Sequence, residues 1–466
     1  TLAGQYEVKL ILLWFATWKN GDMDYAPAWV KRDPARFPRV VSPTGKAIWS
    51  LSPHAEATLA ADRAAFCALC EFLRDRDDER AVIGLQIENE PGILGSPRDY
   101  GPAGEAAYRA EVPAELVERL RAAEGGSVHA LWRAAGSREA GDWETLFGLE
   151  GGECLTAWTI ARYIDRIAAA GKAIYPLPMY VNVWLGEVEW GVPGDSYPSG
   201  GGVSKVLDLY RWAAPHVDLV APDIYPQDPF GFRRLCATYA RPDNPLLVPE
   251  SPTGGANAWN IFRAIADHGA IGYACFGVEN MLDEAGALRP EAEALAGSWR
   301  AAAAAIPLIL RYQGTPHLHA VAQDEYMASQ RLELDGYIGL AQFGDAQVSY
   351  VTKDWRHRAA RPLGGAPGPE ARGRGLVCQV GAHEFYVVGG GFRLLLRRVG
   401  SPEEALDTTV TKPWLQPRAT HYVSVEEGYF DDAGRFRATR RRSGDETDYG
   451  LWVEPNVGVV RAVLCE

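Results

Sequence analysis

The chain has 466 residues, of which 47% are hydrophobic and 23% are charged, and its net charge is −13. This is an ordinary globular composition with room for more than one domain. The negative charge argues against nucleic acid and anionic membrane surfaces as main partners. No apolar run approaches the roughly 18 residues that are needed to cross a membrane.

Short apolar runs of strand length recur through the first two thirds of the chain, with helical patterns between them. They cover residues 8–15, 81–88, 177–184, 217–225, 246–250 and 271–276. Continuous apolar strands that alternate with helices indicate β/α units and a parallel sheet. The runs end in polar or aromatic residues, as in a (β/α)8 barrel, where functional groups lie at the carboxyl ends of the strands. An open doubly wound sheet is the alternative, but no glycine-rich phosphate turn follows the first run.

Cys67 and Cys70 form a CxxC pair inside the helical pattern that follows residue 53. No second Cys or His pair follows at the spacing of a zinc site. We therefore expect these thiols to lie in the core, and we expect no disulfide framework, no metal and no cofactor.

The pattern changes in the last third of the chain. Residues 291–313 read as a helix that Pro307 interrupts, and it closes the barrel domain. Later segments such as 376–399 alternate between apolar and polar residues and are punctuated by Gly, which is typical of antiparallel strands in a sandwich. We expect a barrel domain at residues 1–312 and a β-sandwich-like domain at residues 313–466.

The stretch AVIGLQIENEPG, residues 81–92, is a buried-looking strand that ends in two carboxylates and an amide. Burying a carboxylate without a partner is costly. We therefore expect Glu88 and Glu90 to have either a bonding partner or a functional role. A second carboxylate, Glu250, ends the run in NPLLVPESPTG. Two carboxylates on different strands of one barrel mouth suit the hydrolysis of a glycosidic bond.

Several of these segments resemble a known family. GLQIENEPG is similar to the Q-[IV]-E-N-E-[YPV]-G segment of glycoside hydrolase family 35 β-galactosidases. LLWFATWKNGDMDYAPAWVKRDPARFPRV and LVAPDIYPQDP resemble a bacterial branch of that family with a β-rich C-terminal module. The resemblance covers most of residues 8–290 and, more weakly, the module.

The resemblance implies a retaining enzyme with a (β/α)8 fold that acts on β-galactosides. It implies that Glu90 is the acid/base, that Asn89 is its sugar-binding neighbour and that Glu250 is the nucleophile. Glu88 is expected to be structural and tied to a basic or amide neighbour.

The family's two catalytic strands are the fourth and seventh of eight, whereas here they are the second and fifth of six. The chain also begins without Met and almost at once with a strand. We therefore expect a TIM barrel that lacks its first two β/α units. This predicts a gap between the first and last strand, and little or no turnover by residues 1–466 alone.

Other polar and aromatic residues at the predicted strand ends are candidates for binding the sugar. Trp faces would stack on the ring, Asn side chains would bond to its hydroxyls, and one Tyr would donate a hydrogen bond to the nucleophile carboxylate. The candidates are Trp18, Asn20, Asn182, Trp184 and Tyr225. For each of them, ordinary packing or loop capping is the alternative.

The sequence favours a retaining exo-β-galactosidase that takes a β-galactoside oligosaccharide or glycoside. Two alternatives stay open. One is a related β-glycosidase that acts on arabinopyranosides, fucosides or xylosides, and the other is a carbohydrate-binding protein without catalysis. A homo-oligomer is also left open.

Overall fold

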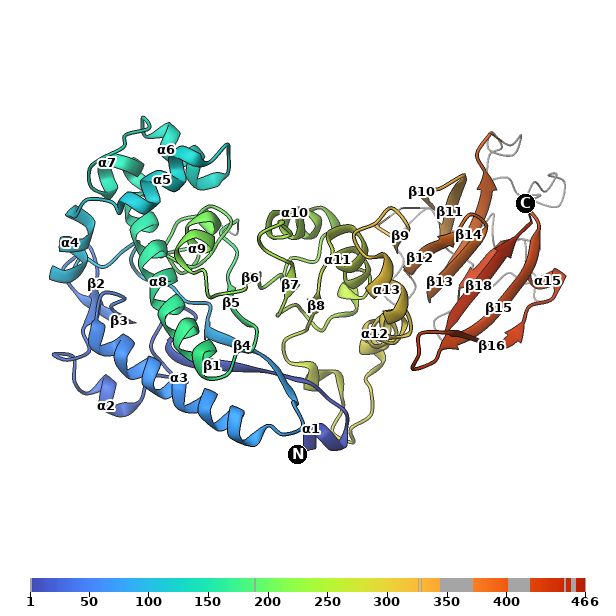
Figure 1. Ribbon diagram of the computed structural model, residues 1–466, viewed down its shortest axis with the longest axis horizontal. Coiled ribbons are helices and arrows are strands. Elements are labelled where there is room, and N and C mark those ends of the chain that lie inside the picture. The colour runs from blue at the N-terminus through green and yellow to red at the C-terminus, as the bar shows by residue number, and fades with distance from the viewer. Residues whose placement is uncertain are drawn as a thin grey trace. The chain divides into compact units, whose positions relative to one another are not determined.

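The structure is a computed structural model that describes residues 2–187, 190–325, 327, 329–343, 372–400, 420–447, 450–453 and 458–465. The chain divides into two compact units, Thr1–Asp223 with Arg241–Pro249, and Ile224–Ala240 with Glu250–Glu466 (Figure 1). Each unit is built from two stretches of chain, so no single cut separates them. The domain boundary after residue 312 stays a prediction from the sequence.

The first unit contains a parallel sheet with the strand order β1-β4-β5-β6. Its strands are β1 Leu10–Lys19, β4 Val82–Asn89, β5 Met179–Val183 and β6 Leu219–Pro222. β4 is buried along nearly its whole length, which explains its continuous apolar sequence. The predicted parallel β/α organisation is confirmed for these strands, whereas the (β/α)8-type barrel and its missing first two units stay predictions.

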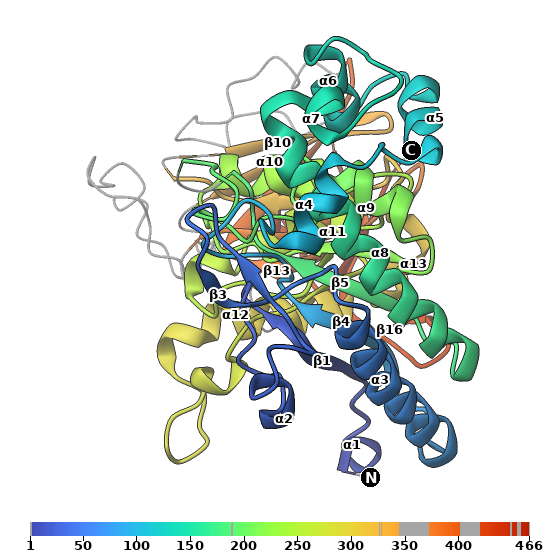
Figure 2. The same cartoon turned by 90° about the vertical axis from the view of Figure 1, so that its left-hand side faces the viewer.

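Two long helices, α3 Glu56–Arg76 and α8 Gly151–Ile174, pack side by side against this sheet (Figure 2). α3 buries Leu59, Phe66, Cys70 and Leu73, which recur at helical spacing on one face. α8 carries Gly171 at the crossing, where an added Cβ would lie 2.4 Å from the Phe66 ring. The glycine therefore permits the close approach of the two helices.

The remaining elements of the first unit are short. They are α1 Leu2–Gln5, α2 Ala28–Lys31, β2 Arg39–Val41, β3 Ala47–Leu51, α4 Pro102–Arg109, α5 Ala114–Ala122, α6 Ser127–Ala134, α7 Trp143–Phe147, η1 Gly148–Glu150, α9 Leu207–Ala213 and β7 Leu247–Val248. β7 is shorter than the apolar run at residues 246–250 that predicts it, and its Leu247 packs against Tyr180, Leu219 and Ala221.

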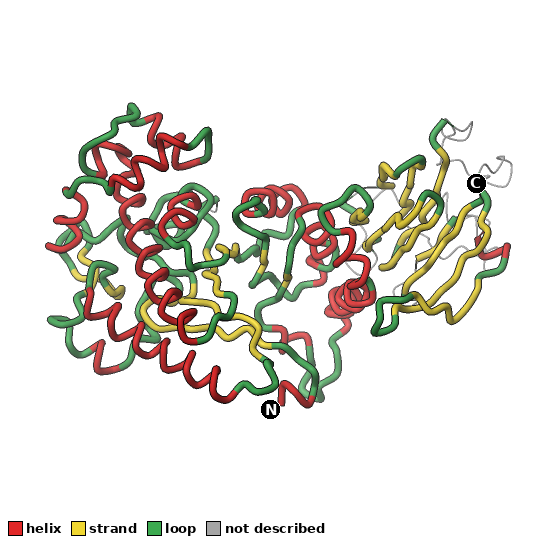
Figure 3. Tube along the Cα trace, viewed as in Figure 1, coloured by secondary structure: helices red, strands yellow, loops and turns green. Residues whose placement is uncertain are grey.

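The second unit contains two antiparallel sheets, with the orders β10-β11-β14-β17 and β16-β15-β18-β13-β12-β9, drawn in yellow in Figure 3. Their strands are β9 Leu318–Ala322, β10 Ser329–Leu334, β11 Tyr337–Phe343, β12 Arg374–Gly381, β13 Glu384–Gly390, β14 Phe392–Arg398, β15 Tyr422–Phe430, β16 Phe436–Arg441, β17 Leu451–Val453 and β18 Val459–Leu464. The antiparallel strands that were predicted for this part of the chain are confirmed.

The six-stranded sheet contributes to two different cores because successive side chains of a strand point to opposite faces. Val377 and Val387 face the four-stranded sheet, where Phe343, Phe392 and Leu394 complete one core. Their neighbours Leu376, Cys378, Tyr386 and Val388 face the helices on the other side. Arg374 ties this face to a helix by donating hydrogen bonds to Ser298 Oγ (2.9 Å) and Ala294 O (3.1 Å).

The helices of the second unit are α10 Pro229–Tyr239, α11 Asn260–His268, α12 Glu293–Ala304, α13 Ile306–Tyr312 and α15 Gly444–Thr447, with 3₁₀ turns η2 Gly255–Asn257, η3 Val278–Met281 and η4 Pro290–Ala292. β8 is confined to Gly272–Tyr273. The predicted interruption at Pro307 is confirmed, because α12 ends at Ala304 and Pro307 lies in the first turn of α13, where a missing N–H is tolerated. Among the described residues, no helix is long and apolar enough to cross a membrane.

Candidate active site

The carboxyl end of β4 has an unusual backbone. Glu88 and Glu90 both have positive φ values, 59° and 47°, a region that residues other than glycine seldom occupy. The ladder between β1 and β4 shifts register at this point, between Trp14 and Lys19 on β1. Such strained conformations cluster at functional sites, which makes this strand end a candidate active site.

Glu88 is fully buried and holds the end of β1. Its carboxylate accepts hydrogen bonds from the backbone N–H groups of Thr17 (3.1 Å) and Trp18 (2.8 Å), with a longer bond from Ala16 (3.3 Å). Burial, and then the nearby carboxylate of Asp62, raise the pKa of Glu88 well above its ordinary value. The partners of Glu88 are therefore main-chain amides, and its close side-chain neighbour is an acid.

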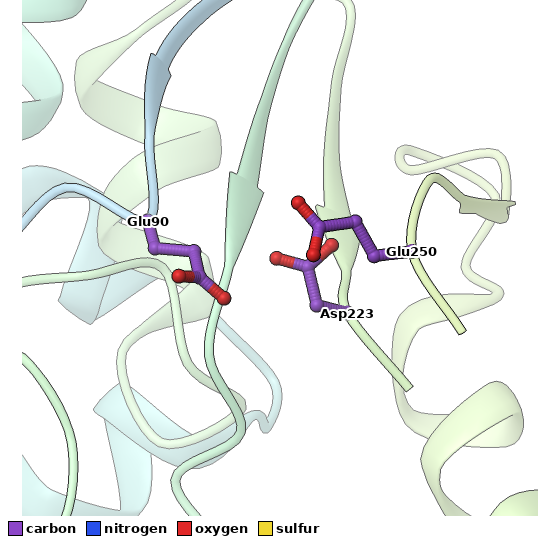
Figure 4. Close-up of side chains that lie close together, drawn as sticks. All are labelled: Glu90, Asp223 and Glu250. Atoms are coloured by element: carbon purple, nitrogen blue, oxygen red, sulfur yellow. The ribbon is translucent and has the colours of Figure 1, made fainter. Parts of the chain in front are cut away.

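Glu90 lies next to a second buried carboxylate in the first unit. The side chains of Glu90 and Asp223 point toward one another, as Figure 4 shows, and each offers a carboxylate oxygen within 4.8 Å of the other. Glu90 is 5% exposed and Asp223 is 2% exposed. Asp223 follows directly after β6 and its N–H donates to Val183 O (3.0 Å). Two carboxylates are fewer oxygens than a hard cation normally takes, so we propose no cation site here.

Asn182 joins Glu90 to Asp223. Its Oδ1 accepts a hydrogen bond from the backbone N–H of Glu90 (3.0 Å), and its Nδ2 donates to Asp223 Oδ2 (2.8 Å). The side chain is fully buried at the end of β5. These bonds fix which end of the amide faces Glu90.

Glu250 belongs to the second unit, and it is the third side chain labelled in Figure 4. Tyr225 OH donates a hydrogen bond to its Oε2 (2.8 Å), and Ile224 N–H donates to its backbone oxygen (2.9 Å). The structure thus contains the hydrogen bond that the sequence predicts between Tyr225 and Glu250. The catalytic meaning of that bond stays a prediction.

A buried polar network fixes the residue after Glu250. Ser251 Oγ donates to Ala274 O (2.7 Å) and accepts from Asn257 Nδ2 (3.0 Å). Asn257 Oδ1 accepts in turn from Tyr273 OH (2.5 Å). The segment that carries Glu250 is therefore anchored to β8 and to the 3₁₀ turn η2.

The remaining predicted residues occupy different environments. Asn89 is buried, and among the described residues its Nδ2 has no hydrogen-bond partner. Trp18 is also fully buried, with its ring edge-on to Tyr163 at a centroid distance of 4.8 Å. This placement favours packing for Trp18. Asn20 Oδ1 accepts from Lys19 Nζ (2.6 Å), and Trp184 is half-buried after β5.

Sequence reasoning did not single out Asp223 as a site residue. It stands in VAPDIY, where its Asp is one of several polar residues at a strand end. Its importance follows from the parallel pairing of β5 with β6, which places it beside Asn182. Because that register is a property of the folded sheet, the sequence pattern offered only a weak signal.

Comparisons with known proteins give limited matches. A family described as "Domain of unknown function (DUF5597)" matches residues 295–454, which is less than half of the chain. No curated protein matches the chain.

Several solved structures are similar to the chain at low identity. A β-galactosidase from the psychrophilic Marinomonas ef1 is 14% identical with a TM-score of 0.42, over 66% of this chain and 51% of that one. A β-galactosidase from Bacillus circulans sp. alkalophilus is 14% identical with a TM-score of 0.41, over 64% and 47%. The catalytic domain of a β-amylase from Paenibacillus polymyxa is 12% identical with a TM-score of 0.43, over 62% and 81%. The chain spans about half of the length of the two β-galactosidases, and likeness at this level assigns no activity to it.

Proposed function

We propose that the protein is a retaining exo-β-galactosidase in which Glu90 is the acid/base and Glu250 is the nucleophile. The observation that carries the proposal is the buried Glu90 carboxylate, which ends a parallel strand in a strained conformation beside a second carboxylate. The ENE motif and the family resemblance of the sequence support the same assignment.

The reaction proceeds in two displacements. In the first, Glu250 attacks the anomeric carbon, the bond to the leaving oxygen breaks, and Glu90 gives that oxygen its proton. In the second, Glu90 takes a proton from water, the water oxygen attacks the same carbon, and Glu250 leaves. This route requires carboxyl groups about 5 Å apart, whereas about 6.5–9.5 Å would suit an inverting enzyme.

Two features of the described residues suit these roles. The hydrogen bond that Tyr225 OH donates to Glu250 Oε2 can hold that side chain in place for attack. The buried Nδ2 of Asn89 is a donor that a sugar hydroxyl can satisfy. Asn89 is therefore proposed to bind the hydroxyl beside the reacting carbon, and the sugar-binding roles of Asn20, Asn182, Trp18 and Trp184 stay predictions from the sequence.

The test is turnover of a panel of nitrophenyl β-glycosides by protein expressed from its complete coding sequence, with β-galactoside expected as the best substrate. Trapping with a slow 2-fluoro galactoside should add one sugar to the peptide that contains Glu250, and Glu250→Gln should abolish the adduct. Glu90→Ala should lose far more activity on disaccharides than on activated nitrophenyl substrates, because a good leaving group needs little protonation. An adduct on another carboxylate would disprove the assignment.

The same panel decides between the alternatives. Preference for an arabinopyranoside, fucoside or xyloside would keep the mechanism and change the substrate. Sugar binding without turnover of any substrate would indicate a carbohydrate-binding protein.

A further inference from the structure

We propose that Asp223 is a positioning residue for Glu90 and acts on it through Asn182. The inference rests on the proposed role of Glu90 as the acid/base and adds a residue that this role requires. Asp223, Asn182 and Glu90 all belong to the first unit, on the ends of three neighbouring strands of one sheet.

The link depends on the direction of each hydrogen bond. A side-chain amide has one accepting and one donating end, whereas an ionised carboxylate only accepts. Asp223 Oδ2 therefore selects the Nδ2 end of Asn182, and this leaves Oδ1 to accept from the N–H of Glu90. Without Asp223, the N–H of Glu90 would still prefer the accepting end of Asn182. The bond that holds the other end of the amide would be missing, however, and the side chain could turn away from Glu90.

The backbone of Glu90 makes this orientation matter. Its φ of 47° is an unfavourable conformation that persists only where neighbouring groups hold it. The bond from its N–H to Asn182 is one of the restraints. If the restraint is lost, the peptide can relax and carry the Glu90 carboxylate away from the leaving oxygen, and general acid catalysis is sensitive to such a displacement.

The experiment compares Asp223→Ala with Asp223→Asn. The first removes the acceptor, whereas the second keeps an oxygen that can accept from Asn182. The readout is kcat/KM on β-galactosides with poor and good leaving groups, because this ratio reports the step in which Glu90 donates its proton. Asp78→Asn is the control, since Asp78 is exposed in the turn before β4.

For Asp223→Ala we expect about a 100-fold loss on an alkyl β-galactoside and less than about a threefold loss on a dinitrophenyl β-galactoside. Asp223→Asn should retain most of the activity on both substrates, and the control should match the unaltered protein. Equal losses on both substrates would show a merely structural role and overturn the proposal, as would the absence of any loss.

A second measurement needs no turnover. Hydrogen exchange followed by mass spectrometry should show faster exchange of the Glu90 amide in Asp223→Ala than in the unaltered protein and the control. Unchanged exchange would overturn the proposed link. A protein expressed from its complete coding sequence that hydrolyses no glycoside would disprove the proposed function instead, so the two failures are distinguishable.

Discussion

Glu88 and Glu90 are two positions apart at the carboxyl end of β4, yet their surroundings give them different chemistry. The side chain of Glu88 accepts hydrogen bonds from the backbone N–H groups of residues 16–18, whereas Glu90 lies beside Asp223. The sequence predicts that the two residues share a strand end, and it predicts a structural role for Glu88. It could not predict that amides of another strand would hold Glu88, because those contacts depend on the irregular register of β1 against β4.

The raised pKa of Glu88 predicts a pH dependence of stability. The folded protein keeps a proton on Glu88 that the unfolded chain releases above its ordinary pKa of about 4.3. The free energy of unfolding therefore falls as the pH rises from about 4.3 through the raised pKa. Urea unfolding between pH 4.5 and 8 should show that Glu88→Gln loses this part of the slope. Glu118→Gln, on an exposed face of α5, should keep it, and an unchanged slope in Glu88→Gln would contradict the interpretation.

A second prediction concerns Tyr225, whose OH donates to Glu250. Tyr225→Phe should lower kcat/KM by about tenfold, because a hydrogen bond to a charged group contributes about 1.5–3 kcal/mol and solvent compensates for part of it at this exposed residue. Steady-state kinetics on nitrophenyl β-galactoside measures the loss. Tyr429→Phe, at an exposed position of β15, is the matched control. Equal kinetics of the two variants would count against a role for Tyr225.

At the scale of elements, the segment that carries Glu250 lies in the sequence between two very short strands. β7 and β8 have two residues each. The sequence predicts longer strands here, because an apolar run shows which residues are buried and does not show which of them form hydrogen bonds to a neighbouring strand. The segments after them are held instead by side chains, chiefly through Ser251 and Asn257. Such a network has no period in the sequence, which is why only the structure reveals it.

Asn257→Ala tests how much this network stabilises the segment. The change leaves Ser251 and Tyr273 each short of a buried hydrogen-bond partner, and we expect a loss of about 2–4 kcal/mol in the free energy of unfolding. Urea denaturation gives this value directly. Asn280→Ala, at an exposed site in η3, should change it by less than about 0.5 kcal/mol. A loss as small as that of the control would show that the network contributes little.

For the whole molecule, the sequence correctly separates a parallel β/α part from an antiparallel part. It could not show that α11, α12 and α13 cover one face of the six-stranded sheet, because helical patterns do not indicate which sheet a helix packs on. A boundary at residue 312 would divide that core, and the match to residues 295–454 also begins inside α12.

We therefore predict that a fragment of residues 250–466 is more soluble than one of residues 313–466. The shorter fragment lacks the helices and exposes Leu376, Tyr386 and Val388 on an open apolar face. Sedimentation and binding of a hydrophobic dye would compare the two. A monomeric shorter fragment that binds no dye would show that this face does not need its helices.

The two-core arrangement of the six-stranded sheet also has a consequence for synthesis on the ribosome. α11 buries Ile261, Phe262 and Ile265 in a core that includes Leu318 of β9, the first strand of this sheet in the sequence, and Leu318 follows Ile265 by 53 positions. At about 5–20 residues per second, roughly 3–11 s pass before that partner is made. During this time the apolar face of α11 has no sheet to cover it, and it is the segment of the nascent chain that chaperones would be expected to bind.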